Sequence, residues 1–428
     1  MSPASGELRR AAVIGGNRIP FARSNGPYSH ASNQDMLTTA IDGLADRYGL
    51  AGERIGDVAA GAVLKFSREI NLTRECVLGS KLAPETPAFD VGQACGTGLE
   101  AAILMANKIA LGQVDSAVAG GSDTTSDAPI GVGESLRKKL LHVNRQKDTK
   151  GKVLGLTRIR PGDIKLDIPA NREARTGLSM GEHTAITAKE WGITREAQDE
   201  LAYNSHKNMA AAYEEGWQDD LISPYLGLER DNNLRPDTTL EALAKLKPVF
   251  GGKDGTMTAA NSTPLTDGAS AVLLSTKEWA EERGLTPRAR FVDGETAAVD
   301  YIIKQEGLLL APAYAVPRLL ARNGLALQDF DFYEIHEAFA AQTLATLKAW
   351  EDPAFCKNRL GLSKPLGSID RAKLNVKGGS LAAAHPFAAT GGRIVANLAK
   401  LLEEKGSGRG LISICAAGGQ GIVAIMER

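Results

Sequence analysis

The chain has few cysteines, only four among 428 residues. Four cysteines do not make the disulfide framework of a small secreted scaffold, so we expect a reducing compartment and individual roles for the thiols. Charge is nearly balanced, with a formal net charge of −1 at pH 7, which gives no reason to expect nucleic acid as a partner. No apolar run approaches the ~20 residues that a membrane span needs. The length suits two or three domains with a large core.

Targeting and metal-binding signals are also missing. Residues 1–10 are polar, and the apolar run 11–14 is too short for the core of a secretory signal peptide. The end of the chain, 425–428, carries no peroxisomal tripeptide. We therefore expect a cytoplasmic protein. No C-x-x-C or H-E-x-x-H spacing occurs, so we expect no metal site.

Short apolar runs alternate with helix-like segments along most of the chain, which predicts a layered α/β protein with helices on both faces of its sheets. The expected strands lie at 10–15, 57–64, 88–91, 116–119, 269–274, 288–293, 330–335 and 411–414, and the expected helices at 33–48, 73–82, 99–111, 172–191, 194–215, 312–323, 338–350 and 391–404.

The middle of the chain differs from its two ends. Between 128 and 250 the sequence is polar and helical, without continuous strand-like runs. On either side, a Gly-rich turn, an Ala-rich helix and a strand ending in Gly-Gly occur twice, which indicates a duplicated α/β unit. We therefore predict a first half at 1–123 plus 250–286, an inserted, mostly helical loop domain at 124–249, and a second half at 287–428.

One cysteine stands in a motif of its own, the stretch 93–98 (QACGTG). It follows a strand-like run and begins a helix with an apolar stripe, so Cys95 faces the positive end of the helix dipole and its free N–H groups. Both effects favour the thiolate, which is the nucleophilic form. A small buried hydrophobe is the equally plausible alternative for a cysteine in this position.

Three more reactive side chains stand at the ends of expected strands or the starts of helices, where α/β proteins place their sites. They are His336, His385 and Cys415. A histidine in such a place is more often structural than catalytic, but a cysteine with histidines elsewhere in the chain is a candidate nucleophile–base pair.

Taken together, these blocks resemble the signature blocks of the thiolase family. The resemblance rests on Cys95 with its flanks, residues 336–339 (HEAF), 378–386 (GGSLAAAHP) and 415–421 (CAAGGQG), with 258–269 as a fifth block, and it covers almost the whole chain in the expected order. A histidine opening the second block resembles the branch of the fatty-acid trifunctional enzyme β subunit. The resemblance implies the thiolase fold, with an α/β/α/β/α layered core built from duplicated βαβ halves.

The family resemblance implies an activity, the CoA-dependent cleavage of a 3-ketoacyl-CoA in β-oxidation. His385 would take the Cys95 proton, the thiolate would attack the C3 ketone, and Cys415 would protonate the departing acetyl-CoA enolate. His385 and His336 would bind the thioester oxygen, and the backbone N–H groups of Cys95 and Ala417 would bind the oxygen on the acylated carbon. CoA is then a substrate, and no other cofactor is expected.

Other readings stay open at this point. The same chemistry run backwards would make a biosynthetic acetoacetyl-CoA thiolase, and a non-catalytic acyl-CoA-binding subunit is the rival from another class. Thr263 matches the family position at the pantetheine arm of CoA, although a hydroxyl that satisfies a loop turn is as plausible. Ala384 and Ala388 stand where thiolases usually carry glycine, so they could crowd the pocket.

A basic tract between 137 and 160 contains nine Lys and Arg with leucines and valines among them. A solvated surface is the default for such a tract, and the functional alternatives are CoA phosphates, a partner subunit or an anionic membrane surface. The family resemblance adds the expectation of a homodimer or homotetramer and of a hydratase/dehydrogenase α-type partner.

Overall fold

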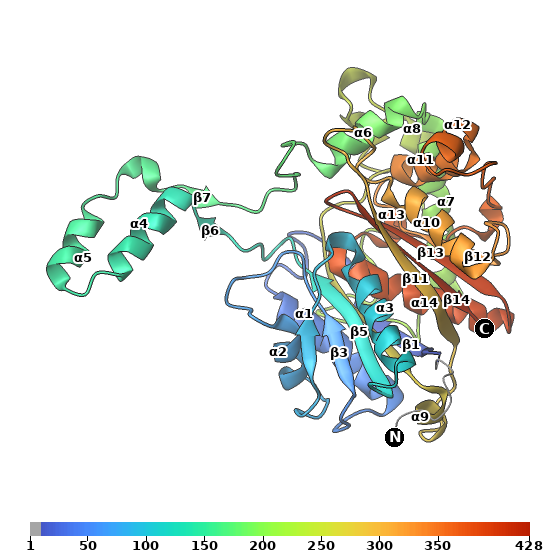
Figure 1. Ribbon diagram of the computed structural model, residues 1–428, viewed down its shortest axis with the longest axis horizontal. Coiled ribbons are helices and arrows are strands. Elements are labelled where there is room, and N and C mark those ends of the chain that lie inside the picture. Colours follow the sequence, from blue (N-terminus) through green and yellow to red (C-terminus); the bar gives the residue numbers. More distant parts are fainter. Residues whose placement is uncertain (1–9) are drawn as a thin grey trace.

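A computed structural model describes residues 10–428. Residues 1–9 lie outside the described residues, and the expectation about a signal peptide rests partly on them. A ten-stranded mixed sheet runs through the molecule in the order β12-β13-β14-β11-β1-β10-β5-β3-β4, with β2 paired to β10 (Figure 1). The strands of this sheet are β1 Ala12–Arg18, β2 Ala22–Arg23, β3 Asp57–Ala60, β4 Ala88–Asp90, β5 Ser116–Asp123, β10 Thr266–Ser275, β11 Ala289–Ala298, β12 Phe332–Ile335, β13 Arg409–Ala416 and β14 Gln420–Glu427.

The sheet consists of two half-sheets of matching topology. In the first, the last strand β10 lies between β1 and β5 and runs antiparallel to both, while β3 pairs in parallel with β5 and β4. In the second, β14 lies antiparallel between β11 and β13, and β12 pairs in parallel with β13. A parallel bridge from Tyr333 to Leu374 stands where the first half-sheet has β4. The predicted duplication is therefore confirmed.

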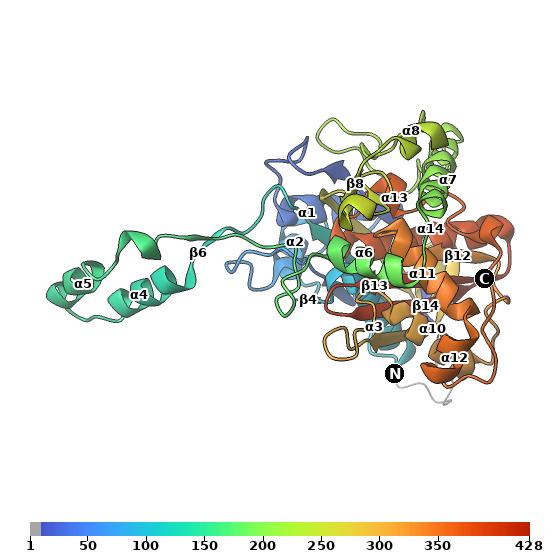
Figure 2. The same cartoon turned by 90° about the horizontal axis from the view of Figure 1, so that it is seen from above.

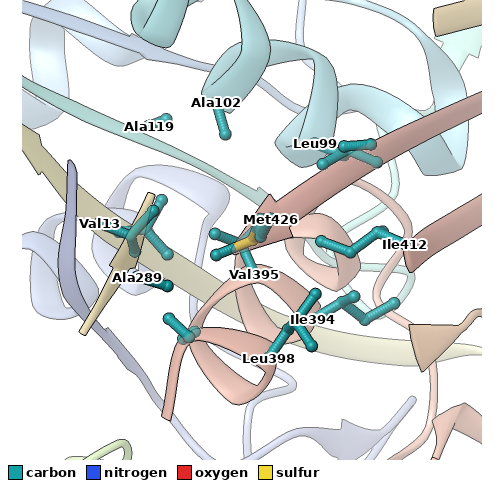
Figure 3. Close-up of a cluster of buried hydrophobic side chains, with 14 of the residues drawn as sticks. Val13, Leu99, Ala102, Ala119, Ala289, Ile394, Val395, Leu398, Ile412 and Met426 are labelled. Carbon is teal, nitrogen blue, oxygen red and sulfur yellow. The ribbon is translucent and has the colours of Figure 1, made fainter. Parts of the chain in front are cut away.

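Three helical layers cover the two half-sheets. Helices α1 Asn33–Tyr48 and α2 Leu72–Gly79 share one apolar cluster with the first half-sheet, and α10 Ala311–Asn323 and α11 Ala340–Glu351 share another with the second. Helices α3 Thr97–Ala110 and α14 Thr390–Lys405 lie between the half-sheets. Their side chains pack with those of strands from both half-sheets in the central cluster seen in Figure 3. This arrangement confirms the predicted α/β/α/β/α core.

The two central helices cross at glycines. A Cβ added at Gly391 would overlap the backbone of Gly98 and Leu99, and one added at Gly98 would lie 2.6 Å from the Ala388 carbonyl oxygen. Only glycine allows backbones to approach this closely. The crossing matters for function, because α3 begins two residues after Cys95 and α14 begins five residues after His385.

The segment between the half-sheets contains two parts that lie apart. Helices α6 Met180–Glu190, α7 Arg195–Glu214 and α8 Leu240–Ala244 lie on the body of the molecule, as do the short strands β8 Pro248–Phe250 and β9 Met257–Thr258. Residues 128–170, which we call the arm, project far from the body in both views (Figures 1 and 2). The arm contains β6 Gly131–Val132, α4 Glu134–Asn144, α5 Thr149–Leu156 and β7 Leu166–Asp167.

Several predicted boundaries are wrong for local reasons. The helix expected from residue 172 begins only at Met180, because Ser179 caps it: the Ser179 hydroxyl accepts from Glu182 N, and the Glu182 carboxylate accepts from Ser179 N. The strand expected at 57–64 ends at Ala60, since Asp123 accepts the N–H groups of Val63 and Leu64. Strand β14 was not predicted. Short helices complete the inventory: α9 Lys277–Glu281, α12 Pro353–Asn358 and α13 Ser380–Ala383.

None of the helices within residues 10–428 combines the length and the apolar character that a membrane crossing requires.

Candidate active site

Cys95 lies in a tight 3-10 turn, Ala94–Gly96, that leads directly into α3. The Thr97 hydroxyl accepts from Gln93 N at 2.9 Å and donates to the Ala94 carbonyl at 2.8 Å, which closes the turn. Ala94 adopts the left-handed region at φ 48°, and a Cβ at Gly96 would overlap Ile422 of the other half-sheet. The turn is thus held against β14, which places Cys95 at the junction of the two halves.

The Cys95 thiol is protonated in this environment. Burial raises its pKa to about 12, although N–H groups of Ala417 and of Cys95 itself act in the opposite direction. The thiolate expected at a helix start is therefore not the resting form, because desolvation outweighs the favourable backbone groups. A base would have to take the proton before this thiol could act as a nucleophile.

His385 is placed to be that base. Its backbone N–H donates to the Thr266 hydroxyl at 3.3 Å, and its Nδ1 lies 2.6 Å from the Thr390 hydroxyl. Burial and the nearby Arg393 lower the imidazole pKa to about 3, so the ring is neutral. Its Nε2 is buried and has no hydrogen-bond partner within residues 10–428. A neutral ring with a free Nε2 is the form that accepts a proton.

His336 directly follows β12, and Cys415 is the last residue but one of the neighbouring parallel strand β13. The backbone N–H of His336 donates to the Ser413 carbonyl at 2.8 Å, which aligns the end of β12 with that of β13. The His336 ring lies 4.1 Å from the His385 ring between centroids. Burial, His385 and Arg393 lower the pKa of His336, whereas burial and the nearby Cys95 raise that of Cys415. Both groups are therefore neutral at pH 7.

The four predicted side chains thus meet at one place. A narrow cavity of about 50 Å³ has Cys95, His385 and Cys415 in its wall, with Ala417 beside them. The remaining wall consists of Asn171, Met180, Thr263, Pro264, Leu265, Leu309, Ala338, Phe339 and Phe387. The wall is mostly apolar, as suits an acyl group.

Thr263 lines this cavity, and its hydroxyl donates to the Ala338 carbonyl at 2.9 Å. The Thr263 hydroxyl thus forms a hydrogen bond that stabilises the loop, and its side chain lines the same cavity as Cys95, His385 and Cys415. The loop that carries Thr263 continues into a second cavity of about 280 Å³, whose wall includes Ala259, Ala260 and Ser262. Arg23 and Arg235 also line that second cavity, so it is cationic.

Several residues that shape the site were not predicted. Asp123 is buried and accepts from Ala388 N at 2.9 Å, so it links β5 to the loop that follows His385. Glu173, just beyond the arm, accepts from Gly418 N at 2.7 Å and from the Tyr301 hydroxyl at 3.0 Å. These contacts join segments far apart in sequence. Of the hydroxyls next to the two histidines, only Ser380 lies inside a motif block, the stretch 378–386, whereas Thr390 lies beyond it.

Family comparison agrees with the geometry. Residues 11–278 match the family described as thiolase, N-terminal domain, and residues 285–428 match thiolase, C-terminal domain. The chain belongs to the thiolase family. This thiolase is 42% identical over 424 residues to a 3-ketoacyl-CoA thiolase of Pectobacterium atrosepticum, covering 98% of this chain and 96% of that protein. It is 39% identical over the same length to a 3-ketoacyl-CoA thiolase of Yersinia pestis, covering 98% and 97%.

Solved thiolase structures have the same fold. The acetyl-CoA acetyltransferase of Bacillus anthracis superposes with a TM-score of 0.81 at 28% identity, over 99% of this thiolase and 100% of that chain. Human mitochondrial 3-ketoacyl-CoA thiolase superposes with a TM-score of 0.80 at 29% identity, over 98% and 99%.

Proposed function

We propose that this thiolase is a 3-ketoacyl-CoA thiolase of β-oxidation, which uses CoA to cleave a 3-ketoacyl-CoA into acetyl-CoA and a shortened acyl-CoA. The observation that carries the proposal is the meeting of two neutral thiols, one from each half, with a neutral imidazole in one apolar cavity. The relatives that match over nearly the full length bear this name.

The first step forms the acyl-enzyme. His385 Nε2 takes the proton of the Cys95 thiol, and the thiolate attacks the C3 carbonyl. The C2–C3 bond then breaks, and its electron pair goes to C2 to give the enolate of acetyl-CoA. Backbone N–H groups of Cys95 and Ala417 would stabilise the oxyanion on C3, and His336 with His385 would stabilise the enolate oxygen.

The second step returns the protons. The Cys415 thiol protonates C2 of the enolate, which is why a thiol with a raised pKa suits this position. Cys415 then takes the proton of an incoming CoA thiol, and the CoA thiolate attacks the acyl group on Cys95. Cys95 leaves as a thiolate and regains the proton from His385, so the cycle closes without any redox change.

CoA enters this scheme as a substrate, with no other cofactor. The loop 259–265 lines both cavities, so an extended ligand can lie along it with its sulfur end at Cys95. The Arg23 and Arg235 side chains at the far end would meet the phosphates, because guanidinium groups recognise phosphate oxygens.

The direct test is to find the acylated residue. After incubation with acetyl-CoA, peptide mass mapping should show acetyl on Cys95. Cys76 and Cys356, both buried and free, are internal controls and should stay unmodified. An adduct on another cysteine with Cys95 intact would contradict the proposal, and saturable acyl-CoA binding without any adduct would favour a non-catalytic binding subunit.

The biosynthetic direction is the second candidate, favoured by the acetyl-CoA acetyltransferase fold neighbour. Rates with a panel of 3-ketoacyl-CoA chain lengths separate the two. Turnover of acetoacetyl-CoA alone would favour the biosynthetic function, and turnover that extends to longer chains would favour β-oxidation.

We further propose that the arm binds an anionic membrane surface. Residues 137–160 hold nine Lys and Arg against one Asp, which leaves a net charge of +8 on a chain whose total is −1. Six of these cations form no ion pair within residues 10–428: Arg145, Lys147, Lys150, Lys152, Arg158 and Arg160. Ten apolar side chains of the arm are 39–68% exposed: Ile130, Val132, Leu140, Leu141, Val153, Leu154, Leu156, Ile164, Leu166 and Ile168. Cations beside exposed apolar groups suit the headgroup region of an anionic bilayer.

Binding to anionic vesicles can distinguish the effect of cations on the arm from the effect of cations elsewhere on the surface. Arg145, Lys147, Lys150 and Lys152 replaced by Ser should lose at least tenfold in binding to phosphatidylglycerol vesicles, because each nearby cation contributes about 1 kcal/mol. The matched control removes four exposed cations from the body, Arg54, Lys304, Lys357 and Lys364, and should bind like wild type. Equal losses in both variants, or binding only to an α-type partner subunit, would contradict the membrane assignment.

We also propose a homodimer or homotetramer. Strand β4 ends the sheet and is half-exposed, and an open strand edge pairs readily with another copy. Light scattering should give at least twice the 45.3 kDa of one chain, and a monomer would contradict this.

A further inference from the structure

A buried serine joins a cation to one of the two histidines of the site. The Ser380 hydroxyl lies 2.8 Å from His336 Nδ1, and it accepts a hydrogen bond from Arg393 Nη2 at 3.0 Å. All three side chains are buried. His336 Nε2, on the other side of the ring, has no hydrogen-bond partner in the described part of the chain.

The chemistry of the three groups fixes the direction of the bonds. A guanidinium only donates, so Arg393 fills one lone pair of the serine oxygen. The hydroxyl proton then needs an acceptor, and within residues 10–428 His336 Nδ1 is the side-chain acceptor in contact with it. A neutral imidazole that accepts at Nδ1 carries its proton on Nε2.

We infer that Ser380 and Arg393 are positioning residues that fix the Nε2–H tautomer of His336, so that this N–H can donate to the thioester oxygen of the enolate. The inference rests on the proposed function for the identity of the ligand. The relay itself is a property of the free protein.

The relay is held rigidly by the residue next to His336. The Glu337 carboxylate accepts from Asn375 Nδ2 at 2.6 Å, from the Ser205 hydroxyl at 2.8 Å and from Leu381 N at 3.2 Å. A Cβ at Gly379 would overlap this carboxylate. Residues 379–381 are therefore pinned against residues 336–337, which fixes the distance between Ser380 and His336.

His385 has the complementary arrangement. Its Nδ1 contacts the Thr390 hydroxyl, which, unlike the Ser380 hydroxyl, accepts no hydrogen bond from Arg393. Nδ1–H can therefore donate to Thr390, which leaves Nε2 as the acceptor for the Cys95 proton. The two neighbouring imidazoles, tilted by 47° to each other, thus take opposite tautomers, one a donor and the other a base. Burial lowers the pKa of both rings, the Arg393 charge acts in the same direction, and both imidazoles are therefore neutral.

The first test reads the tautomer without any substrate. The chain has six histidines, so ¹⁵N-histidine labelling with a His336→Gln variant assigns the His336 signals. Wild type should show a protonated Nε2 and an unprotonated, hydrogen-bonded Nδ1. Ser380→Ala should show a mixture of tautomers, and Ser380→Thr should restore the single form. A protonated Nδ1 in wild type, or a single Nε2–H form in Ser380→Ala, would overturn the inference.

The second test is kinetic and separates the relay from general damage. Ser380→Ala should lower kcat for 3-ketoacyl-CoA cleavage about 10- to 100-fold with KM nearly unchanged, because one oxyanion donor is weakened. Exchange of labelled CoA into acetyl-CoA needs no enolate and should persist.

The matched control is Thr343→Val, which removes a buried hydroxyl 3.4 Å from the His336 backbone carbonyl rather than from its ring. It should retain both rates. Equal loss of cleavage and CoA exchange in Ser380→Ala would overturn the inference, whereas absence of CoA exchange in wild type would overturn the proposed function instead.

Discussion

Cys95 and His385 form a neutral pair, a protonated thiol beside an unprotonated imidazole, because both are desolvated. Burial disfavours whichever form carries the charge, so it raises the pKa of a thiol and lowers that of an imidazole. Cys95 and His385 therefore form no ion pair in the resting site. Charge would develop only when a substrate carbonyl is bound next to the oxyanion donors.

This pairing predicts an unusual pH profile. Acid inactivates a base when its imidazole is protonated, and a His385 pKa of about 3 puts that loss far below pH 5. The kcat/KM for cleavage should therefore stay constant from pH 7 down to pH 5. An imidazole with the ordinary pKa of about 6.5 would lose roughly 25-fold over the same range, and a fall with a midpoint near 6.5 would contradict the account.

At this scale the sequence predicted the reactive atoms but not their state. Cys95, His336, His385 and Cys415 stand in motifs that carry chemistry, so they could be named in advance. The position of Cys95 at a helix start suggested a thiolate, and only the structure shows that burial outweighs the helix. The relay through Arg393 depends on a contact between side chains 13 residues apart, which no spacing rule predicts.

Among the elements, the short helix α13 ends in an unusual backbone. Ala384, which follows it, has φ 75° and ψ −176°, a region that glycine alone occupies freely. This is a position where thiolases usually carry glycine, and the departure was expected to crowd the pocket. The Ala384 methyl is instead fully buried, and Ala384 is not among the described residues that line the cavity. The substitution therefore costs backbone energy rather than pocket volume.

Replacing this alanine tests that statement. Ala384→Gly loses a buried methyl but relieves a strained backbone that costs of order 1–3 kcal/mol. Ala383→Gly loses the same methyl from an ordinary helical backbone and is the matched control. We expect the free energy of unfolding of Ala384→Gly to exceed that of Ala383→Gly by at least about 1 kcal/mol in urea titrations. Equal losses would show that the Ala384 backbone is unstrained.

Element positions were predictable where periodicity was strong. The amphipathic segment at 33–48 coincides with α1, whose capping box at Ser32 and Asp35 is visible in the sequence. Strand β14 was not predicted, although its residues 421–426 are all buried, as suits a strand inside a sheet. The charge of the arm is visible in the sequence, but no local pattern predicts that the arm projects from the body.

The whole molecule is organised so that two halves share one site. Cys95 and Cys415 come from different half-sheets, and Gln93 Nε2 donates to Gln420 Oε1 at 3.1 Å across the junction. The helices that follow Cys95 and His385 meet at Gly98 and Gly391. The distance between Cys95 and His385 therefore depends on how closely the two central helices approach.

A single methyl at this crossing should disturb both stability and catalysis. Gly391→Ala would overlap backbone atoms that cannot rotate away, so it should lower the free energy of unfolding by about 1–3 kcal/mol or more and reduce cleavage. Gly79→Ala is the matched control, since its Cβ would lie 3.8 Å from Thr38 near the end of α2, and it should be neutral or slightly stabilising. Wild-type stability and activity in Gly391→Ala would show that the helices can separate without consequence.

The central claim is that Cys95 and Cys415 have separate roles, the first carrying the acyl group and the second moving the proton at C2. The measurement that tests it most directly compares Cys415→Ala and Cys95→Ala in two exchange reactions of acetyl-CoA. Cys415→Ala should retain exchange of labelled CoA but lose exchange of the methyl protons with deuterated water, with cleavage falling about 10²–10⁴-fold. Cys95→Ala should lose CoA exchange outright. Near wild-type cleavage and methyl exchange in Cys415→Ala would make the second cysteine structural and contradict the account.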